Sequence, residues 1–446
     1  MADTYLTRTQ TTGDRQKMTW SFWIKISGSG GRVFNSINAD WNNNYVSSIH
    51  FNTTGYLTVY NVDGSSNIDV RPSRLYRDKN AWYHIVIAMD TTQSTASDRI
   101  KIYTNGVQET SFVNTTYPPQ NADNTQWNYN GNNLTIGKRV YDTAQYTDGI
   151  ISHFHFIDGT TYTPSAFGET DSTTGEWKIK TDPSVTYGNN GFFIFKDGTN
   201  LSGSTVQDQS GKGNNFTAYG TLTKTEDSPS NVFATLNPLD NFFAQNTFSY
   251  GNTRQLTDNS RYAWSTSTLG MTSGKYYCEV RHSGNIGDNY PEIGIAGRGL
   301  EDTSTALGTV HNTVSYQYNG QILINGTASS FGSAYSSTAI IGIALDVTNS
   351  KIYFSLNGVW QGSGNPTTGA NGKTITTAST VRLGAYFFAG GDYGNSSRVT
   401  FDWNFGNGYF NSTAISSAGT NASGNGIFEY DVPTGYTALS TKGLNL

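Results

Sequence analysis

The chain contains little cysteine, proline or charge. Its 446 residues include one cysteine and ten prolines, and Asp, Glu, Lys and Arg together make up only 14%. The single cysteine excludes an intrachain disulfide framework. Cys278 lies in an alternating strand pattern, which predicts a buried, inert thiol, with a catalytic thiol as the alternative. The formal charge of −5 argues against nucleic acid and anionic membranes as partners, because both favour clustered Lys and Arg.

Long apolar runs and helical periodicity are also missing. No window approaches the roughly 18 apolar residues of a membrane-spanning helix, so no membrane insertion is expected. Residues 1–5 (MADTY) have neither the basic start nor the apolar stretch of a signal peptide, which predicts a protein made in a cytoplasm without that signal. Helix is expected in fewer than about 10% of the residues.

Aromatic residues and glycine, by contrast, are abundant. The 28 Tyr, 23 Phe and 49 Gly are typical of short strands joined by tight turns. One kind of β-hairpin occurs twice, at residues 99–106 (RIKIYTNG) and 351–358 (KIYFSLNG). Each run alternates apolar and polar residues and ends in Asn-Gly, which suits the positive φ angles of a type I′ turn. In a chain of 446 residues this pattern predicts an all-β protein with two β-sandwiches in series.

The first 170 residues carry an ordered series of strand motifs. Residues 19–26 (TWSFWIKI) alternate like a half-buried strand, and residues 80–89 (NAWYHIVIAM) are apolar on both faces, like a central strand. Together with the first hairpin and residues 133–137 and 148–158, their order resembles the laminin-G-like (concanavalin-type) jelly-roll family. The resemblance implies a jelly roll over residues 1–170.

A second series of motifs occupies residues 241–410. Its motifs are residues 269–280 (LGMTSGKYYCEV), 340–346 (IIGIALD), the second hairpin and residues 400–406 (TFDWNFG), in that order. The series resembles the SPRY family. The resemblance implies a SPRY-like sandwich. Cys278 departs from the family pattern, which usually has a bulky aromatic residue there.

Two further segments complete the predicted organisation. Residues 171–240 are rich in turn residues but contain spaced aromatics, which predicts an ordered connector between the sandwiches and not a flexible tether. Residues 411–446 form a C-terminal extension. Both segments resemble parts of phage structural proteins, particularly those of marine phages.

The paired carboxylates of a glycosidase are not found in the sequence. A retaining glycosidase needs two carboxylates roughly 5 Å apart. No Glu-x-Asp-x-x-Glu run occurs, and the adjacent Glu301 and Asp302 would point to opposite faces of a strand. Residues 386–390 (YFFAG) resemble one strand of the alginate lyases, but Phe388 stands in place of its lysine and the partner strand motifs are missing. We therefore expect no enzymatic activity and no cofactor.

Two histidines form a weak candidate for a metal site. His153 and His155 are two residues apart on an expected strand and could bracket a cation. Phe154 and Phe156 alternate with them and suit the core. The histidines are therefore interpreted as part of a solvated or interfacial face, and no metal site is predicted.

Two loops of the first domain combine aromatic rings with amides, as lectin sites do. In such sites a ring stacks on a sugar and amides bond its hydroxyls. The alternative is that the Trp rings pack down on the sandwich. The candidate residues are Trp41, Asn42, Asn44, Tyr45, Trp127, Asn128, Tyr129 and Asn130. In SPRY relatives the loops at one end of the sandwich bind partners, which implies binding by Asp288, Tyr290, Asp392 and Tyr393.

The resemblances together indicate a phage virion surface protein. In one hypothesis it is an adhesin or receptor-binding component that holds host cell-surface glycan. In the alternative it is purely structural, a capsid decoration or a fibre-and-knob subunit that docks on other virion proteins. Either role implies a place on the virion surface, synthesis in the host cytoplasm, contacts with other virion proteins and a homo-oligomer.

Overall fold

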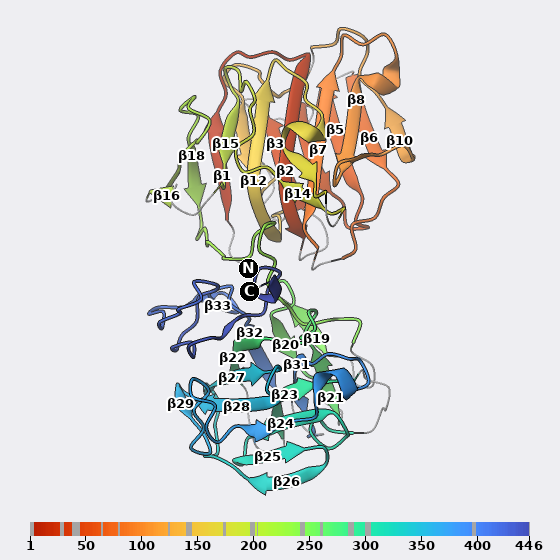
Figure 1. Ribbon diagram of the computed structural model, residues 1–446. Coiled ribbons are helices and arrows are strands. Elements are labelled where there is room, and N and C mark those ends of the chain that lie inside the picture. Colours follow the sequence, from red (N-terminus) through yellow and green to blue (C-terminus); the bar gives the residue numbers. More distant parts are fainter. Residues whose placement is uncertain are drawn as a thin grey trace. The chain divides into compact units, whose positions relative to one another are not determined.

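The computed structural model describes residues 4–26, 31–37, 45–63, 66–78, 81–123, 125–139, 145–172, 175–196, 201–202, 204–240, 246–258, 262–283, 290–298, 305–394 and 398–445. The chain divides into two compact units, unit 1 (Met1–Lys224) and unit 2 (Thr225–Leu446). In the described ranges the only helices are single 3₁₀ turns, η1 (Ala96–Asp98), η2 (Pro164–Ala166), η4 (Ala378–Thr380) and η5 (Gly443–Asn445). None of these could cross a membrane. The all-β prediction is confirmed (Figure 1).

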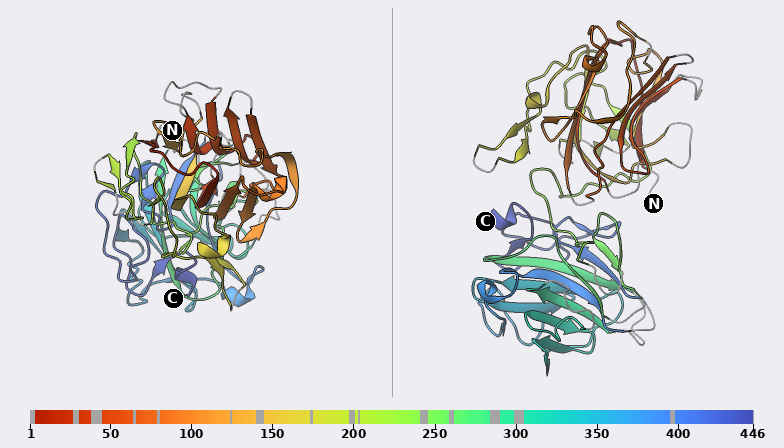
Figure 2. Two further views of the ribbon diagram at one scale, coloured as in Figure 1. Left: turned by 90° about the horizontal axis from the view of Figure 1, so that it is seen from above. Right: turned by 90° about the vertical axis from the view of Figure 1, so that its right-hand side faces the viewer.

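Unit 1 is a sandwich of two antiparallel sheets, seen as two layers in Figure 2, right. The ten-stranded sheet has the order β10 (Phe112–Thr116), β6 (Ser66–Pro72), β5 (Leu57–Asp63), β4 (Tyr45–Phe51), β3 (Gly31–Ile37), β11 (Asn133–Ile136), β1 (Tyr5–Thr9), β18 (Phe216–Tyr219), β17 (Thr205–Val206) and β16 (Leu201–Ser202). The six-stranded sheet has the order β15 (Phe192–Ile194), β12 (Gly149–Asp158), β2 (Lys17–Ile26), β7 (Tyr83–Asp90), β8 (Ile100–Thr104) and β9 (Val107–Gln108).

Strand alternation decides which face of the ten-stranded sheet is buried in this core. Across successive strands, one apolar residue stands opposite the next in register: Leu6, Ile136, Phe34, Ile49, Val59 and Val70. All of them are core residues. Because side chains alternate between faces with a period of two, the residues next to them point to the outer face of the sheet. The exception is Val33, which precedes Phe34 at a register shift in β3 and is itself a core residue.

The residues predicted as a connector, 171–240, are divided between the two units. β15 pairs with β12, and β18 pairs with β1, so these strands extend both sheets of unit 1. Beyond residue 224 the same segment belongs to unit 2, where Phe233 and Leu236 are buried.

Unit 2 is a second sandwich. Its nine-stranded sheet has the order β19 (Thr247–Ser249), β20 (Arg254–Leu256), β32 (Thr400–Asn404), β22 (Lys275–Ser283), β27 (Ile340–Asp346), β28 (Lys351–Leu356) and β29 (Val359–Trp360), with β30 (Lys373–Thr374) on β28 and β35 (Thr437–Ala438) on β22. Its six-stranded sheet has the order β21 (Ala263–Thr266), β31 (Phe387–Asp392), β23 (Pro291–Ala296), β24 (Thr313–Gln317), β25 (Gln321–Ile324) and β26 (Thr327–Ser330). Two small ladders complete the fold, β13 (Gly168–Thr170) with β14 (Trp177–Ile179) in unit 1 and β33 (Tyr409–Phe410) with β34 (Thr413–Ala414) in unit 2.

Strand β22 of unit 2 has a different role on each of its faces. Tyr276, Cys278 and Val280 lie in the core between the sheets. Burial there raises the pKa of the Cys278 thiol well above its usual value, so the predicted buried, inert thiol agrees with the structure. On the other face the carboxylate of Glu279 accepts the backbone N–H groups of Glu429 and Tyr430, at 2.8 and 2.9 Å. These bonds fasten the C-terminal segment to the outer face of the sheet.

Candidate functional site

The outer face of the ten-stranded sheet carries a row of polar residues with one aromatic ring in it. From β3 to β10 the residues opposite one another in register are Asn35, Ser48, Tyr60, Asp69 and Thr116. Neighbouring strands lie about 4.8 Å apart, so the Tyr60 ring has polar side chains within reach on both sides. The row is a direct consequence of the alternation that buries Ile49, Val59 and Val70.

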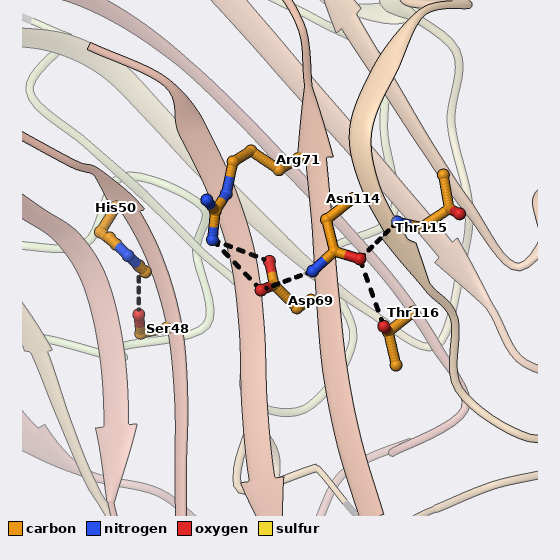
Figure 3. Close-up of polar contacts among 7 residues, drawn as sticks. All are labelled: Ser48, His50, Asp69, Arg71, Asn114, Thr115 and Thr116. Atoms are coloured by element: carbon orange, nitrogen blue, oxygen red, sulfur yellow. Dashed lines mark hydrogen bonds and ion pairs between the residues drawn. The ribbon is translucent and has the colours of Figure 1, made fainter. Parts of the chain in front are cut away.

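On one side of Tyr60, polar groups hold one another in position (Figure 3). Arg71 Nη2 lies 3.1 Å from Asp69 Oδ2, and Asn114 Nδ2 donates to the same oxygen at 2.9 Å. The amide oxygen of Asn114 accepts the backbone N–H of Thr115 at 2.9 Å, which orients the amide. The Asp69 and Arg71 side chains are 21% and 28% exposed, so solvent or a ligand can reach them.

On the other side, Ser48 Oγ and His50 Nδ1 are hydrogen bonded at 2.8 Å. The His50 ring meets the Tyr60 ring edge-on, with 6.3 Å between the ring centres. We call the six residues Ser48, His50, Tyr60, Asp69, Arg71 and Asn114 the Tyr60 surface. It combines one half-buried ring with fixed donors and acceptors, of which Ser48 is itself buried. Its net charge is small, because Arg71 and Asp69 compensate each other.

Two further polar side chains lie on the same face beside this surface. Asn35 is fully buried, and neither its Oδ1 nor its Nδ2 has a hydrogen-bond partner. The Oγ1 of Thr58, the residue opposite His50, is buried without a partner too. Buried polar groups are nearly always paired, so these atoms suit a bound water or a ligand hydroxyl.

The loop predicted to bind sugar at residues 125–131 is buried at residues 125–128 and exposed at Tyr129 and Asn130. Trp127 is fully buried, with its ring 4.6 Å from that of Trp20, so the prediction that it stacks on a ligand is wrong and the packed alternative holds. Asn128 is also fully buried and donates to Asp158 Oδ1 at 2.9 Å. Long-range packing causes both results, because the partners come from other strands.

The ring exposed on that loop is Tyr129. It is 46% exposed, and the guanidinium of Arg15 lies over it at 4.7 Å. Asn130 is exposed as well. In the other predicted loop, Tyr45 is 37% exposed, whereas Trp41, Asn42 and Asn44 lie outside the described residues.

The residues predicted in unit 2 do come together. Tyr290 and Tyr393 have ring centres 5.6 Å apart, and Asp392 Oδ1 accepts the backbone N–H of Tyr290 at 2.9 Å. Asp392 itself is buried, and Asp288 lies outside the described residues. Tyr262 and Tyr318, which the sequence motifs did not indicate, extend the ring contacts at either end, with 5.4 Å to Tyr393 and to Tyr290 respectively.

The histidine pair is buried, so of the predicted solvated or interfacial face the solvated alternative is wrong. His153 and His155 are 7% and 2% exposed, and a register irregularity in β12 lies between Ser152 and His155. His155 Nδ1 bonds the hydroxyl of Tyr187 at 2.9 Å, and burial lowers the pKa of His155 well below its usual value. Within the described ranges, no three His, Cys, Asp or Glu side chains gather as a metal site would need.

A third histidine, His84, has the contacts of a catalytic base but the wrong tautomer. Its Nε2 lies 2.9 Å from Ser21 Oγ, and Trp177 Nε1 donates to its Nδ1 at 2.9 Å. An indole N–H can only donate, so Nδ1 must be the acceptor and Nε2 carries the proton. Nε2 therefore donates to Ser21 and cannot remove its proton.

The sequence did contain a signal for the Tyr60 surface. In residues 57–63 (LTVYNVD), Leu57 and Val59 alternate with Tyr60, and the following strand places Asp69 and Arg71 at matching outward positions. The signal is weak, because the polar face of a strand looks like ordinary alternation and does not stand out as a loop motif does.

Comparison with known proteins places unit 1 in a broad fold group. A family model described as the Concanavalin A-like lectin/glucanases superfamily matches residues 1–162. Unit 1 therefore contains a concanavalin-like domain, as the laminin-G-like resemblance implied. No curated protein matches the chain.

Three solved structures illustrate the structural neighbours. The SPRY domain of human HERC1 is 17% identical, with 38% of this chain and 96% of that one covered, and has a TM-score of 0.29. A carbohydrate-binding protein from Bacteroides ovatus, itself described as putative, is 16% identical, with 51% and 58% covered and a TM-score of 0.33. Stonustoxin is 19% identical and has a TM-score of 0.27. The alignment covers 38% of this chain and only 27% of the stonustoxin chain.

Proposed function

We propose that unit 1 binds glycan through the Tyr60 surface. The supporting observation is the row in which Tyr60 stands between Ser48 on one strand and Asp69 on the next. A sugar ring has apolar faces and a rim of hydroxyls, so it can stack on Tyr60 while Asp69 accepts and Asn114 donates hydrogen bonds. The hydrogen bonds among Asp69, Arg71 and Asn114 form without ligand, so little ordering is needed on binding.

The chemistry of this surface favours a neutral sugar and weak binding at one site. Arg71 is already paired with Asp69, so the surface offers no free cation to an acidic ligand. One stacked ring and a few hydrogen bonds contribute about 1 kcal/mol each. Useful adhesion then requires many copies acting together.

The wider role we propose is that of an adhesin on the surface of a phage virion, with other virion proteins and copies of itself as partners. Support comes from the resemblance of residues 171–240 and 411–446 to phage structural proteins, and from the lectin-type fold of unit 1. The chain would act by binding and not by catalysis.

The decisive experiment measures glycan binding by the whole chain and by three variants. An array of neutral and acidic bacterial glycans first finds a binder, which is then titrated calorimetrically. Tyr60→Ala should weaken binding at least tenfold, because the stacking surface is lost, while Tyr60→Phe keeps most of it. Tyr250→Ala removes a ring of unit 2 that is 46% exposed and lies under an arginine, and it serves as the control.

Two outcomes would contradict this proposal. If no glycan binds, or if Tyr60→Ala and Tyr250→Ala bind equally well, the Tyr60 surface is not a sugar site. Particles carrying Tyr60→Ala that adsorb normally but assemble poorly would favour the purely structural role, as capsid decoration or a fibre-and-knob subunit.

A further inference from the structure

A second aromatic cluster lies on the same outer face, at the other side of the sheet. Tyr5 of β1 and Tyr219 of β18 stand opposite each other in register, and their rings stack with centres 4.8 Å apart and planes at 7°. Their neighbours Leu6 and Ala218 pack in the core, so both rings belong to the outer face. Tyr219 is 47% exposed, although one face of its ring is covered by Tyr5.

A lysine is held against these rings. Lys138 Nζ lies 4.5 Å from the centre of the Tyr5 ring and 5.2 Å from that of Tyr146. Its backbone is fixed as well, because Lys138 is bridged to Tyr146 and its carbonyl accepts Thr135 Oγ1 at 2.9 Å. The ammonium group therefore has a defined position on the sheet face.

Lys138 differs from other lysines of the chain in its electrostatic partners. Lys101 and Lys275 each lie near a carboxylate oxygen, at 3.2 and 3.1 Å. Among the residues that the structure describes, Lys138 forms no ion pair with a carboxylate and meets only tyrosine rings. A ring attracts an ammonium group but accepts none of its three N–H donors fully, so a charged acceptor could still bind there.

The cluster and the Tyr60 surface lie along the same sheet face. Thr7, two residues from Tyr5, stands in register with Thr135, then Asn35, Ser48 and Tyr60. Four strand spacings separate Thr7 from Tyr60, which is roughly 19 Å. Thr135, Asn35 and Ser48 are buried, so the two places are separate exposed areas. Only an oligosaccharide that passes over the covered stretch, and not a single sugar, could contact both.

We propose that Tyr5, Lys138 and Tyr219 form a second subsite, which binds an anionic sugar residue of the same glycan chain. The sugar residue lies across the outer edges of the Tyr219 and Tyr5 rings, and its carboxylate or sulfate group pairs with Lys138, which lies on the other side of Tyr5 from Tyr219. The inference rests on the proposed function and deepens it: the preferred glycan carries acidic residues in addition to the neutral sugar held at the Tyr60 surface.

The test compares probes that differ only in charge. Hexagalacturonate, its fully methyl-esterified form and a sulfated galactan hexasaccharide are titrated against the whole chain. Lys138→Met keeps the apolar length of the side chain and should weaken binding of the preferred anionic probe about tenfold, with no change for the ester. Lys138→Arg should restore most of the affinity. The stronger anionic probe tells whether the subsite suits carboxylate or sulfate.

The matched control is Lys373→Met in unit 2, where Lys373 Nζ lies 5.4 Å from the ring of Phe331. This change removes a lysine in the same kind of contact and should leave all binding unaltered. Raising the salt concentration should weaken only the charged probes, because an exposed ion pair is screened.

Three results would overturn the proposal: equal binding of the charged and esterified probes, no effect of Lys138→Met, or no binding of either anionic probe at millimolar concentration. The variants distinguish failure of the anionic subsite from failure of the Tyr60 surface. If Tyr60→Ala changes nothing while Lys138→Met still acts, the Tyr60 surface fails and the anionic subsite stands. If Tyr60→Ala weakens binding and Lys138→Met does not, the reverse holds.

Discussion

The two Asn-Gly hairpins, one in each unit, are built alike. Asn105 and Asn357 have φ angles of 49° and 48°, and the glycines that follow have 81° and 80°, as a type I′ turn requires. In both turns the Asn carboxamide oxygen accepts a backbone N–H from the adjacent strand, that of His84 at 2.8 Å and that of Ile340 at 2.9 Å. The local sequence therefore makes the same turn in both units.

The difference lies in what covers each turn. A Cβ atom on Gly106 would lie 2.5 Å from the ring of Trp177, and one on Gly358 would lie 2.5 Å from the ring of Tyr430. Each ring belongs to a later segment that packs on the outer face of a sheet. In unit 1 the segment that carries Trp177 covers His84, and Trp177 donates to His84. In unit 2 the segment that carries Tyr430 covers Glu279, which accepts the backbone N–H groups of Glu429 and Tyr430. The same turn thus contacts an aromatic ring in both units. In unit 1 that ring, Trp177, is bonded to the buried base His84, and in unit 2 the ring belongs to Tyr430, whose backbone N–H is bonded to the buried acid Glu279.

Removal of the buried acid should give the largest effect. Glu279→Ala leaves the N–H groups of Glu429 and Tyr430 without their acceptor and should destabilise unit 2 by about 3 kcal/mol. Glu279→Gln keeps one acceptor oxygen and should cost less. Denaturant titration followed by proteolysis and mass spectrometry reports each unit separately. A loss in unit 1 equal to that in unit 2 would contradict this assignment.

The two units should also respond to pH in opposite directions. Burial lowers the pKa of His84 to about 3, so its contribution to stability is present above the unfolded value of 6.5 and is lost as the pH falls. Burial raises the pKa of Glu279 to about 7, so its contribution is present below the unfolded value of 4.5 and is lost as the pH rises toward 7.

Between pH 7.5 and pH 5, His84 should therefore cost unit 1, and Glu279 should give unit 2, about 2 kcal/mol. His155 in unit 1, whose pKa is also lowered by burial, and Glu292 in unit 2, whose pKa burial raises to about 8, add to these changes in the same directions. The same unit-resolved proteolysis, repeated across this range, provides the measurement. In the Glu279→Gln variant the gain in unit 2 should shrink. Parallel pH responses of the two units would show that other groups dominate.

The smallest effect concerns the turns themselves. Gly106→Ala and Gly358→Ala each add a Cβ at positive φ and against a ring, which should destabilise the corresponding unit by about 1–2 kcal/mol. Gly131 and Gly369 have φ angles of 83° and 81°, and a Cβ added at either would meet no atom within 4 Å, so their Ala variants measure the backbone cost alone. If all four variants lose the same stability by thermal unfolding, the ring contacts contribute nothing.

Much of the fold was predictable because it depends on neighbours in sequence. Alternation in residues 19–26 and the two Asn-Gly turns predicted strands and hairpins that the structure contains. The candidate site was less predictable. Tyr290 and Tyr393 were identified and do meet, whereas Trp127 was assigned to the surface and is a core residue.

The sequence alone determined an all-β chain of two sandwiches, because strand period and turn chemistry act over a few residues and survive any arrangement of the strands. Only the tertiary structure decided which rings are covered and which face solvent. Trp127 is buried by Trp20, more than 100 residues earlier, and the Tyr60 row exists because separate strands pair in one register. A slip of one residue in that pairing would turn Tyr60 to the core, so the proposed site depends on register and not on the residues alone.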